Sequence, residues 1–168
     1  PDVGASYFLN KMPGYIGRYL ALTSEILKAE DVIYLDAADH FIESHDWEEL
    51  RKKISTSEWN ISTAGKQLTQ LLDRYELTEL PQSSIASAEK KINKHFKFDT
   101  LEEVVLSLKA AAEKGDNWAL STVERILSLS PVSLKVTFEQ LKKGRQKTPF
   151  ECFEMELALS MNFMKEPN

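Results

Sequence analysis

The chain is organised around its first nine residues, which read Pro1-Asp2-Val3-Gly4-Ala5-Ser6-Tyr7-Phe8-Leu9. It places the Asp2 carboxylate between a proline, which fixes one backbone dihedral, and Gly4, which permits a dihedral that other residues avoid. Asp2 is therefore expected on a constrained turn that enters a short helix, where the helix dipole favours a negative charge. The spacing alone favours a helix N-cap, and a side chain aimed into a ligand site is the alternative.

Outward from this stretch, apolar residues recur with the period of an amphipathic helix. Leu101, Val104 and Leu108, for example, share one helical face. An extended piece at Asp39–Ile42 and a connector at Glu76–Ser84 interrupt the helices. The expected helices are Val3–Lys11, Tyr15–Leu22, Ala29–Leu35, Trp47–Lys53, Asn60–Tyr75, Ile85–His95, Leu101–Lys114, Asn117–Leu129, Val132–Lys143 and Pro149–Met164.

Helix start signals support this reading. Three capping boxes and one Ser-Pro pair mark the starts: Asp46 with Glu49, Asp99 with Glu102, Thr148 with Glu151, and Ser130-Pro131. The sequence therefore predicts a mainly α fold with at most one or two short strands.

The last expected helix carries a long apolar stripe. Its members are Phe150, Phe153, Leu157, Met161 and Met164. Such a stripe has to be buried by other helices or by a further layer of protein. A packing seam is its commoner use, and the lining of an acyl tunnel is the alternative.

Composition narrows the class of protein. The 168 residues are 42% hydrophobic and 28% charged, with a net charge of −5. This charge argues against a nucleic-acid surface, and no apolar run approaches the length that spans a bilayer, so neither nucleic acid nor membrane is expected as a partner. The single cysteine, Cys152, excludes an internal disulfide framework and is expected as a small buried hydrophobe.

No metal or nucleotide cofactor is expected from the residue types. His40 and His45 lie across a change from strand to loop, and the nearby carboxylates of Asp39, Glu43 and Asp46 do not complete a metal geometry. The sequence also lacks the glycine-rich phosphate motifs, the Gly-x-Ser-x-Gly elbow and any Cys-x-x-Cys pair.

Four segments carry a resemblance to a known family: Pro1–Leu9 as quoted, Gly14-Tyr15-Ile16-Gly17-Arg18-Tyr19-Leu20-Ala21-Leu22-Thr23, Ile26-Leu27-Lys28-Ala29-Glu30-Asp31-Val32 and His40-Phe41-Ile42. They resemble the second half of the 3-hydroxyisobutyryl-CoA hydrolase branch of the enoyl-CoA hydratase/isomerase (crotonase) superfamily. Ordinary hydratases read Pro-Gly-Ala-Gly-Gly at the first motif and have glycine where this chain has Asp2, whereas the hydrolase branch has aspartate.

The resemblance implies a fold and a place in it. Residues 1–45 correspond to the end of a crotonase-like α/β spiral core, and residues 46–168 to a helical C-terminal region. We expect the chain to be the C-terminal portion of a longer protein. The missing N-terminal half would supply a catalytic Glu and the backbone amides of an oxyanion hole.

The implied reaction is hydrolysis of the thioester of 3-hydroxyisobutyryl-CoA, a step of valine breakdown. Asp2 would be the catalytic and substrate-binding residue, contacting the 3-hydroxyl or the attacking water. Coenzyme A is part of the acyl-CoA substrate, so no separate cofactor is implied, and no metal is needed. Superfamily members commonly trimerise, so a homo-oligomer is expected. The location would be cytoplasmic in a bacterium and the mitochondrial matrix in a eukaryote.

Two other classes stay open at this point. One is another crotonase enzyme, a hydratase or isomerase, in which Asp2 is incidental. The other is a non-catalytic helical binding module. Residues 1–168 alone are expected to be inactive, because the Glu and the amide donors are not encoded in them.

Overall fold

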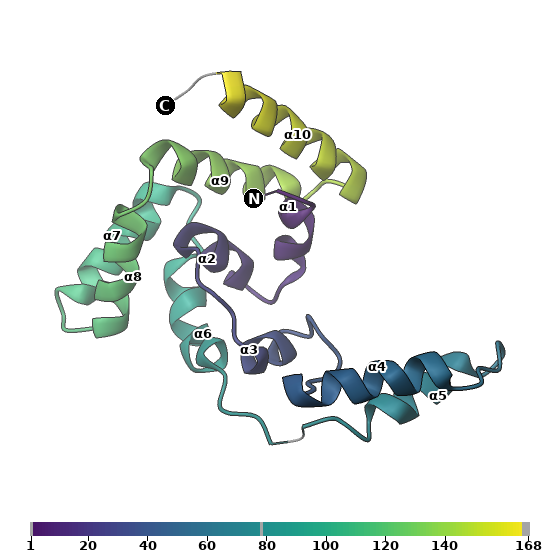
Figure 1. Ribbon diagram of the computed structural model, residues 1–168. Coiled ribbons are helices and arrows are strands. Elements are labelled where there is room, and N and C mark those ends of the chain that lie inside the picture. Colours follow the sequence, from purple (N-terminus) through teal and green to yellow (C-terminus); the bar gives the residue numbers. More distant parts are fainter. Residues whose placement is uncertain (1, 78, 166–168) are drawn as a thin grey trace. The chain divides into compact units, whose positions relative to one another are not determined.

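The computed structural model describes residues 2–77 and 79–165, and these are mainly helical (Figure 1). The expected mainly α architecture is confirmed. In the described residues the extended piece at Asp39–Ile42 reduces to one isolated antiparallel bridge, between Ile42 and Glu76. The α-helices are α1 (Ala5–Phe8), α2 (Ile16–Thr23), α3 (Ala29–Tyr34), α4 (Trp47–Thr56), α5 (Ala64–Leu72), α6 (Ser84–His95), α7 (Leu101–Ala112), α8 (Asn117–Leu127), α9 (Pro131–Gly144) and α10 (Pro149–Lys165).

The chain forms two compact units. One comprises the residues up to Ile26 together with those from Ala88 onward, and the other is Leu27–Ser87. This division differs from the expected boundary at residue 45, because the first helices pack with α8, α9 and α10 rather than with the segment that follows them. The assignment of residues 1–45 to a spiral core stays a prediction.

The core of the first unit lies around α2. This helix packs against α8 and α9, and α7 pairs with α8. The Tyr19 ring meets the Phe96 ring edge to face, with centroids 5.3 Å apart, and stacks on Trp118 at 6.0 Å. The fully buried side chains of this unit include Ile16, Leu22, Ile92, Phe96, Val104, Leu108, Ile126 and Phe138. Each contributes on the order of 1.5–3 kcal/mol to folding.

Within the second unit, the buried carboxylate of Asp31 connects two segments of the chain. It accepts hydrogen bonds from the Ser83 hydroxyl at 2.7 Å and from the amides of Ile85 and Lys28, each at 3.1 Å. Burial pushes the pKa of Asp31 upward, but these hydrogen bonds outweigh it and hold the pKa below its usual range. The carboxylate therefore ties α3 to the start of α6.

Two of the start signals are confirmed. Thr148 and Glu151 form a reciprocal capping box at α10, and the Ser130 hydroxyl caps α9 with a proline in its first turn. The cap of α7 is one residue later than predicted, at Thr100 with Glu103. Asp99 comes too early because α7 begins at Leu101.

The prediction of a capping box at Asp46 is wrong. Asp46 is the N-cap of α4, but its side chain makes no capping hydrogen bond. A 3-10 turn at Ser44–Asp46 precedes the helix, and Asp46 has helical dihedrals (φ −86, ψ −14) instead of the extended ones that aim a cap side chain at the first amides.

Two expected helices are shorter than predicted by several residues. In the Val3–Lys11 segment α1 begins only at Ala5, because Val3 and Gly4 have positive φ, and it ends at Phe8, where a 3-10 turn at Leu9–Lys11 follows. The Asn60–Tyr75 segment is helical only over α5, because a turn closed by the Thr63 amide on the Asn60 carbonyl precedes it. Of the Glu76–Ser84 connector, Thr78 lies outside the described residues.

The apolar stripe of α10 lies on the surface. Exposed fractions run from 44% at Met161 to 77% at Met164. Cys152, on another side of the same helix, is buried as expected, and burial raises the pKa of its thiol. In the described parts of the chain, none of the helices combines the length and apolarity that crossing a membrane requires.

Candidate active site

The Asp2 segment is a tight turn with a strained backbone. The Ala5 amide donates to the Asp2 carbonyl at 3.0 Å, and the two residues between them have positive φ, 51° at Val3 and 85° at Gly4. Positive φ at both central positions is the signature of a type I′ turn, which valine rarely enters. A Cβ at Gly4 would also lie 3.1 Å from the Phe153 ring. The expectation of a constrained turn that needs glycine is confirmed.

Asp2 is not the cap of the helix that follows. The N-cap of α1 is Gly4, with no side-chain capping bond. The Asp2 side chain is exposed, and its Oδ1 accepts the amide hydrogen of Val3 at 2.7 Å. The cap reading of Asp2 is therefore wrong, and its carboxylate lies on the surface of the turn.

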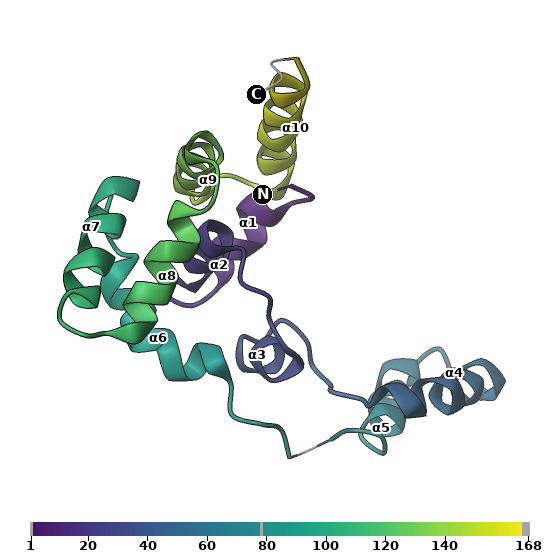
Figure 2. The same cartoon turned by 60° about the vertical axis from the view of Figure 1, so that its left-hand side comes forward.

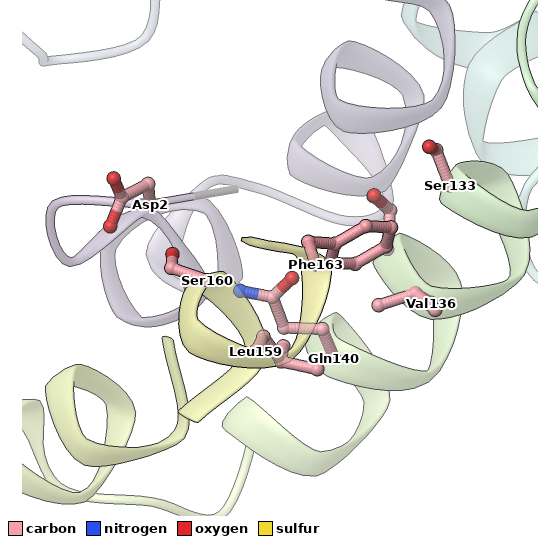
Figure 3. A pocket seen from close by; sticks show the side chains of 8 residues that line it. Asp2, Ser133, Val136, Gln140, Leu159, Ser160 and Phe163 are labelled. Carbon is pink, nitrogen blue, oxygen red and sulfur yellow. The ribbon is translucent and has the colours of Figure 1, made fainter. Parts of the chain in front are cut away.

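Asp2 is one of the residues that line a pocket of about 410 Å³. Four lining residues have the spacing of one helical face of α9, three come from α10, and Asp2 lies at the margin of the group (Figure 3). The lining residues are Asp2, Ser133, Val136, Thr137, Gln140, Leu159, Ser160 and Phe163. Apolar side chains mixed with a few hydroxyls, an amide and one carboxylate suit a short hydroxylated acyl chain.

A buried glutamate of α10 binds the main-chain amides of the Asp2 turn. Glu156 is 2% exposed, and its two carboxylate oxygens accept the amide hydrogens of Gly4 at 2.7 Å and Ser6 at 2.8 Å. Burial pushes the pKa of Glu156 upward, but the hydrogen bonds from Ser6 and Gly4 outweigh it and hold the pKa below its usual value. Glu156 is therefore ionised at neutral pH.

Ser6 connects the same turn to α9. Its buried hydroxyl accepts a hydrogen bond from the Gln140 amide at 2.7 Å, and its carbonyl accepts one from Asn10 at 2.7 Å. The Asn10 amide also donates to the Leu141 carbonyl at 2.9 Å. Gly144 allows this approach, because a Cβ there would lie 2.6 Å from the Ser6 carbonyl oxygen. Both views show α1 beside α9 and α10 (Figures 1 and 2).

Sequence reasoning singled out Asp2 and missed Glu156, Ser6 and Gln140. Their hydrogen bonds join residues more than 130 positions apart, so no local pattern reveals them. One signal was available. Glu156 follows Cys152 by one helical turn, which places a carboxylate on the buried side of α10 instead of on the solvent side.

His40 and His45, the histidines considered as metal ligands, are not among the residues that line this pocket. His40 Nδ1 lies 3.4 Å from a carboxylate oxygen of Glu76, with Asp73 close by, and His45 pairs with Glu43 and Asp46 at 3.7 and 3.6 Å. All these groups belong to the second unit. The absence of a metal site stays a prediction.

Comparison with known proteins identifies the relatives of this chain. The family profile described as enoyl-CoA hydratase/isomerase matches residues 1–168. The chain is 34% identical to the mitochondrial 3-hydroxyisobutyryl-CoA hydrolase of Xenopus laevis, over 98% of the chain and 42% of the relative. It is 32% identical to small ribosomal subunit protein mS47 of Neurospora crassa, over 98% of the chain and 35% of that protein.

A solved structure shares the fold. A carnitinyl-CoA dehydratase from Mycobacterium thermoresistibile superposes with a TM-score of 0.83 at 23% identity, over 99% of this chain and 46% of the other. The chain thus spans about two fifths of the length of the curated relatives it matches.

Proposed function

Because the chain belongs to the enoyl-CoA hydratase/isomerase family, we propose that it forms the C-terminal part of a CoA thioester hydrolase. The proposed substrate is 3-hydroxyisobutyryl-CoA, which would place the enzyme in valine degradation. Several relatives carry that hydrolase name at 32–35% identity. The observation that carries the proposal is that Asp2 is among the residues lining a pocket of about 410 Å³ between α9 and α10.

In the proposed reaction, water adds to the thioester carbonyl, the C–S bond breaks, and the CoA sulfur leaves and takes up a proton. Backbone amides stabilise the oxyanion of the tetrahedral intermediate, and a Glu activates the attacking group. The resemblance assigns both to the part of the protein that precedes this chain. That part would also cover the exposed stripe of α10.

Asp2 would accept a hydrogen bond from the substrate's 3-hydroxyl or from the attacking water. Its place among the residues that line the pocket supports this role, as does the exposure of Asp2, whose Val3 hydrogen bond occupies only one lone pair of Oδ1. A site built around a hydroxyl discriminates strongly against analogues that lack it, because the binding group is then left unpaired.

The test is Asp2→Asn in the whole protein, assayed on a panel of short acyl-CoA esters for both hydrolysis and hydration. We expect hydrolysis of 3-hydroxyisobutyryl-CoA to fall by about 10²–10⁴-fold, because the charge that orients the hydroxyl or the water is lost. Asp36→Asn is the matched control, since Asp36 is also an exposed aspartate but is not among the residues that line this pocket. Unchanged hydrolysis in Asp2→Asn, or hydration instead of hydrolysis, contradicts the proposal and favours a hydratase or isomerase.

The relatives also support a second candidate, a component of the mitochondrial small ribosomal subunit. Two relatives named mS47, from Neurospora crassa and Arabidopsis thaliana, match at 32% identity over nearly the whole chain. The net charge of −5 argues against direct contact with ribosomal RNA. Co-sedimentation of the protein with the small subunit, without thioesterase activity, would favour this candidate.

The proposed partners and location follow from the same relatives. Coenzyme A enters as part of the substrate, and no other cofactor is proposed. The hydrolase names of the vertebrate relatives include the word mitochondrial, so the mitochondrial matrix is the proposed location in a eukaryote, and the cytoplasm in a bacterium. A homo-oligomer stays a proposal for the whole protein.

A further inference from the structure

We propose that Glu156 is a positioning residue for Asp2. It does not reach the pocket itself. It acts through the main-chain amides of Gly4 and Ser6, which its carboxylate fixes on the buried side of the Asp2 turn. The inference rests on the proposed function of Asp2 and adds a residue far along the chain that determines where the Asp2 carboxylate lies.

The first support is the burial and geometry of the Glu156 carboxylate. Each oxygen accepts one amide hydrogen, at 2.7 and 2.8 Å, and the side chain is 2% exposed. Hydrogen bonds to an ionised acceptor are shorter and stronger than neutral ones, and a buried carboxylate that loses its partners is strongly destabilised. The two amides are therefore held in one place.

The second support is the strain in the turn. Val3 has φ 51°, a left-handed conformation that its branched Cβ disfavours. An unfavourable dihedral persists only when surrounding contacts determine it, and such outliers gather at functional sites. The Glu156 bond to Gly4 lies directly after Val3, so it is the contact best placed to hold the strained residue and, with it, Asp2.

The third support is that the helices that hold the Asp2 turn, α9 and α10, also line the pocket. Glu156 and the lining residues Leu159, Ser160 and Phe163 all lie on α10. Gln140 both lines the pocket from α9 and donates to the Ser6 hydroxyl. The hydrogen bonds of Glu156 and Gln140 thus fix the position of the Asp2 turn relative to α9 and α10.

The test compares Glu156→Gln with Glu154→Gln in the whole protein. Glu154 lies two residues before Glu156 on α10 and is exposed. Its variant therefore makes the same chemical change without removing a contact to the turn. The glutamine at 156 can accept one amide hydrogen but presents an NH₂ donor to the other amide. Glu156→Asp keeps the charge on a shorter side chain, and its values are expected between those of the wild type and Glu156→Gln.

The first readout is hydrogen exchange of the Gly4 and Ser6 amides, which does not depend on any activity. We expect exchange to be about tenfold faster or more in Glu156→Gln and unchanged in Glu154→Gln. Unchanged exchange in Glu156→Gln, with the protein folded, overturns the proposal even if Asp2 proves to be essential.

The second readout is thioester hydrolysis in a double-mutant cycle. Glu156→Gln should lower kcat by about tenfold or more with a smaller change in KM, and adding it to Asp2→Asn should lower kcat no further. Multiplicative losses in the double variant would show that Glu156 acts independently of Asp2 and would overturn the proposal. If Asp2→Asn itself has no effect, the proposed function fails, and the exchange readout still decides whether Glu156 holds the turn.

Discussion

Glu156 shows how a single buried carboxylate can organise a surface turn. Its hydrogen bonds to Gly4 and Ser6 outweigh the cost of burying the charge, since they keep the pKa of the carboxyl below its ordinary value. The same bonds stabilise the fold, because the unfolded chain does not make them. Positioning and stability therefore depend on the same ionised group.

This dependence predicts how the stability contributed by Glu156 varies with pH. A carboxyl whose pKa is lowered in the folded state adds stability above the unfolded pKa, near 4.5, and this addition is lost as the pH falls through the folded pKa. At pH 7, Glu156→Gln should reduce the free energy of unfolding by about 2 kcal/mol. Urea unfolding at pH 7 and below pH 4 measures the difference between the two proteins, which should shrink at the lower pH. A difference independent of pH contradicts the account.

His95 predicts a further loss of stability as the pH falls, at a second buried site. Its side chain is 2% exposed, and its Nδ1 lies 2.8 Å from the Ser107 hydroxyl. Burial lowers the pKa of His95, and Lys94 lowers it further. In the unfolded chain the imidazole takes up a proton near pH 6.5, so the unfolded state binds more protons and stability falls as the pH drops below this value.

Thermal unfolding of the wild type and of His95→Gln between pH 8 and pH 5 tests this. The wild-type Tm should decrease below pH 6.5 more steeply than that of His95→Gln, and the exposed His45→Gln should behave like the wild type. Parallel pH profiles in the wild type and His95→Gln would mean that the buried imidazole does not control this loss.

At the scale of elements, the packing of α1 on α9 depends on a glycine. A methyl group at Gly144 would lie 2.6 Å from the Ser6 carbonyl oxygen. This oxygen is a backbone atom, so it cannot move away by a change of side-chain rotamer. Gly144→Ala should therefore destabilise the protein by about 2–3 kcal/mol and displace the Asp2 segment from α9.

Gly65→Ala is the control for this substitution. Gly65 is an exposed glycine in α5 with no atom within 4 Å of the added methyl group. It should raise stability by about 0.5–1 kcal/mol, since alanine loses less entropy in a helix. The Tm of the two variants checks both expectations. Equal effects would show that the contact with Ser6 adds nothing to the cost at Gly144.

The helices were predictable from the sequence where their signals are local. Thr148 with Glu151 and Ser130 with Pro131 mark helix starts through atoms three or fewer residues apart, and the structure has both. Asp46 failed because a preceding 3-10 turn changed its dihedrals, which its residue type does not reveal. The position of α1 was equally hidden, since it depends on left-handed dihedrals at Val3 that tertiary contacts impose.

The candidate site was predictable only in part. Asp2 stood out because the hydrolase branch has aspartate where hydratases have glycine. The residues that hold and enclose it come from α9 and α10, so they became visible only once the chain was folded.

At the scale of the whole molecule, the chain is one portion of a family fold. It spans about two fifths of its curated relatives and superposes on 46% of a crotonase-fold dehydratase. In the described residues the long stripe of α10 is exposed, although its spacing is that of a packing face. The lining of the pocket between α9 and α10 carries one carboxylate, that of Asp2, and the resemblance assigns the catalytic Glu and the backbone amides of the oxyanion hole to the part of the protein that precedes this chain. The proposed activity therefore belongs to the whole protein.

The most direct measurement is the selectivity of the whole protein for a hydroxylated acyl group. It compares kcat/KM for 3-hydroxyisobutyryl-CoA with kcat/KM for isobutyryl-CoA, in the wild type and in Asp2→Asn. If Asp2 binds the 3-hydroxyl, the wild type should prefer the hydroxylated ester by about 10²-fold or more, and Asp2→Asn should lose most of that preference. A preference of the same size in both proteins, or none in the wild type, would contradict the account.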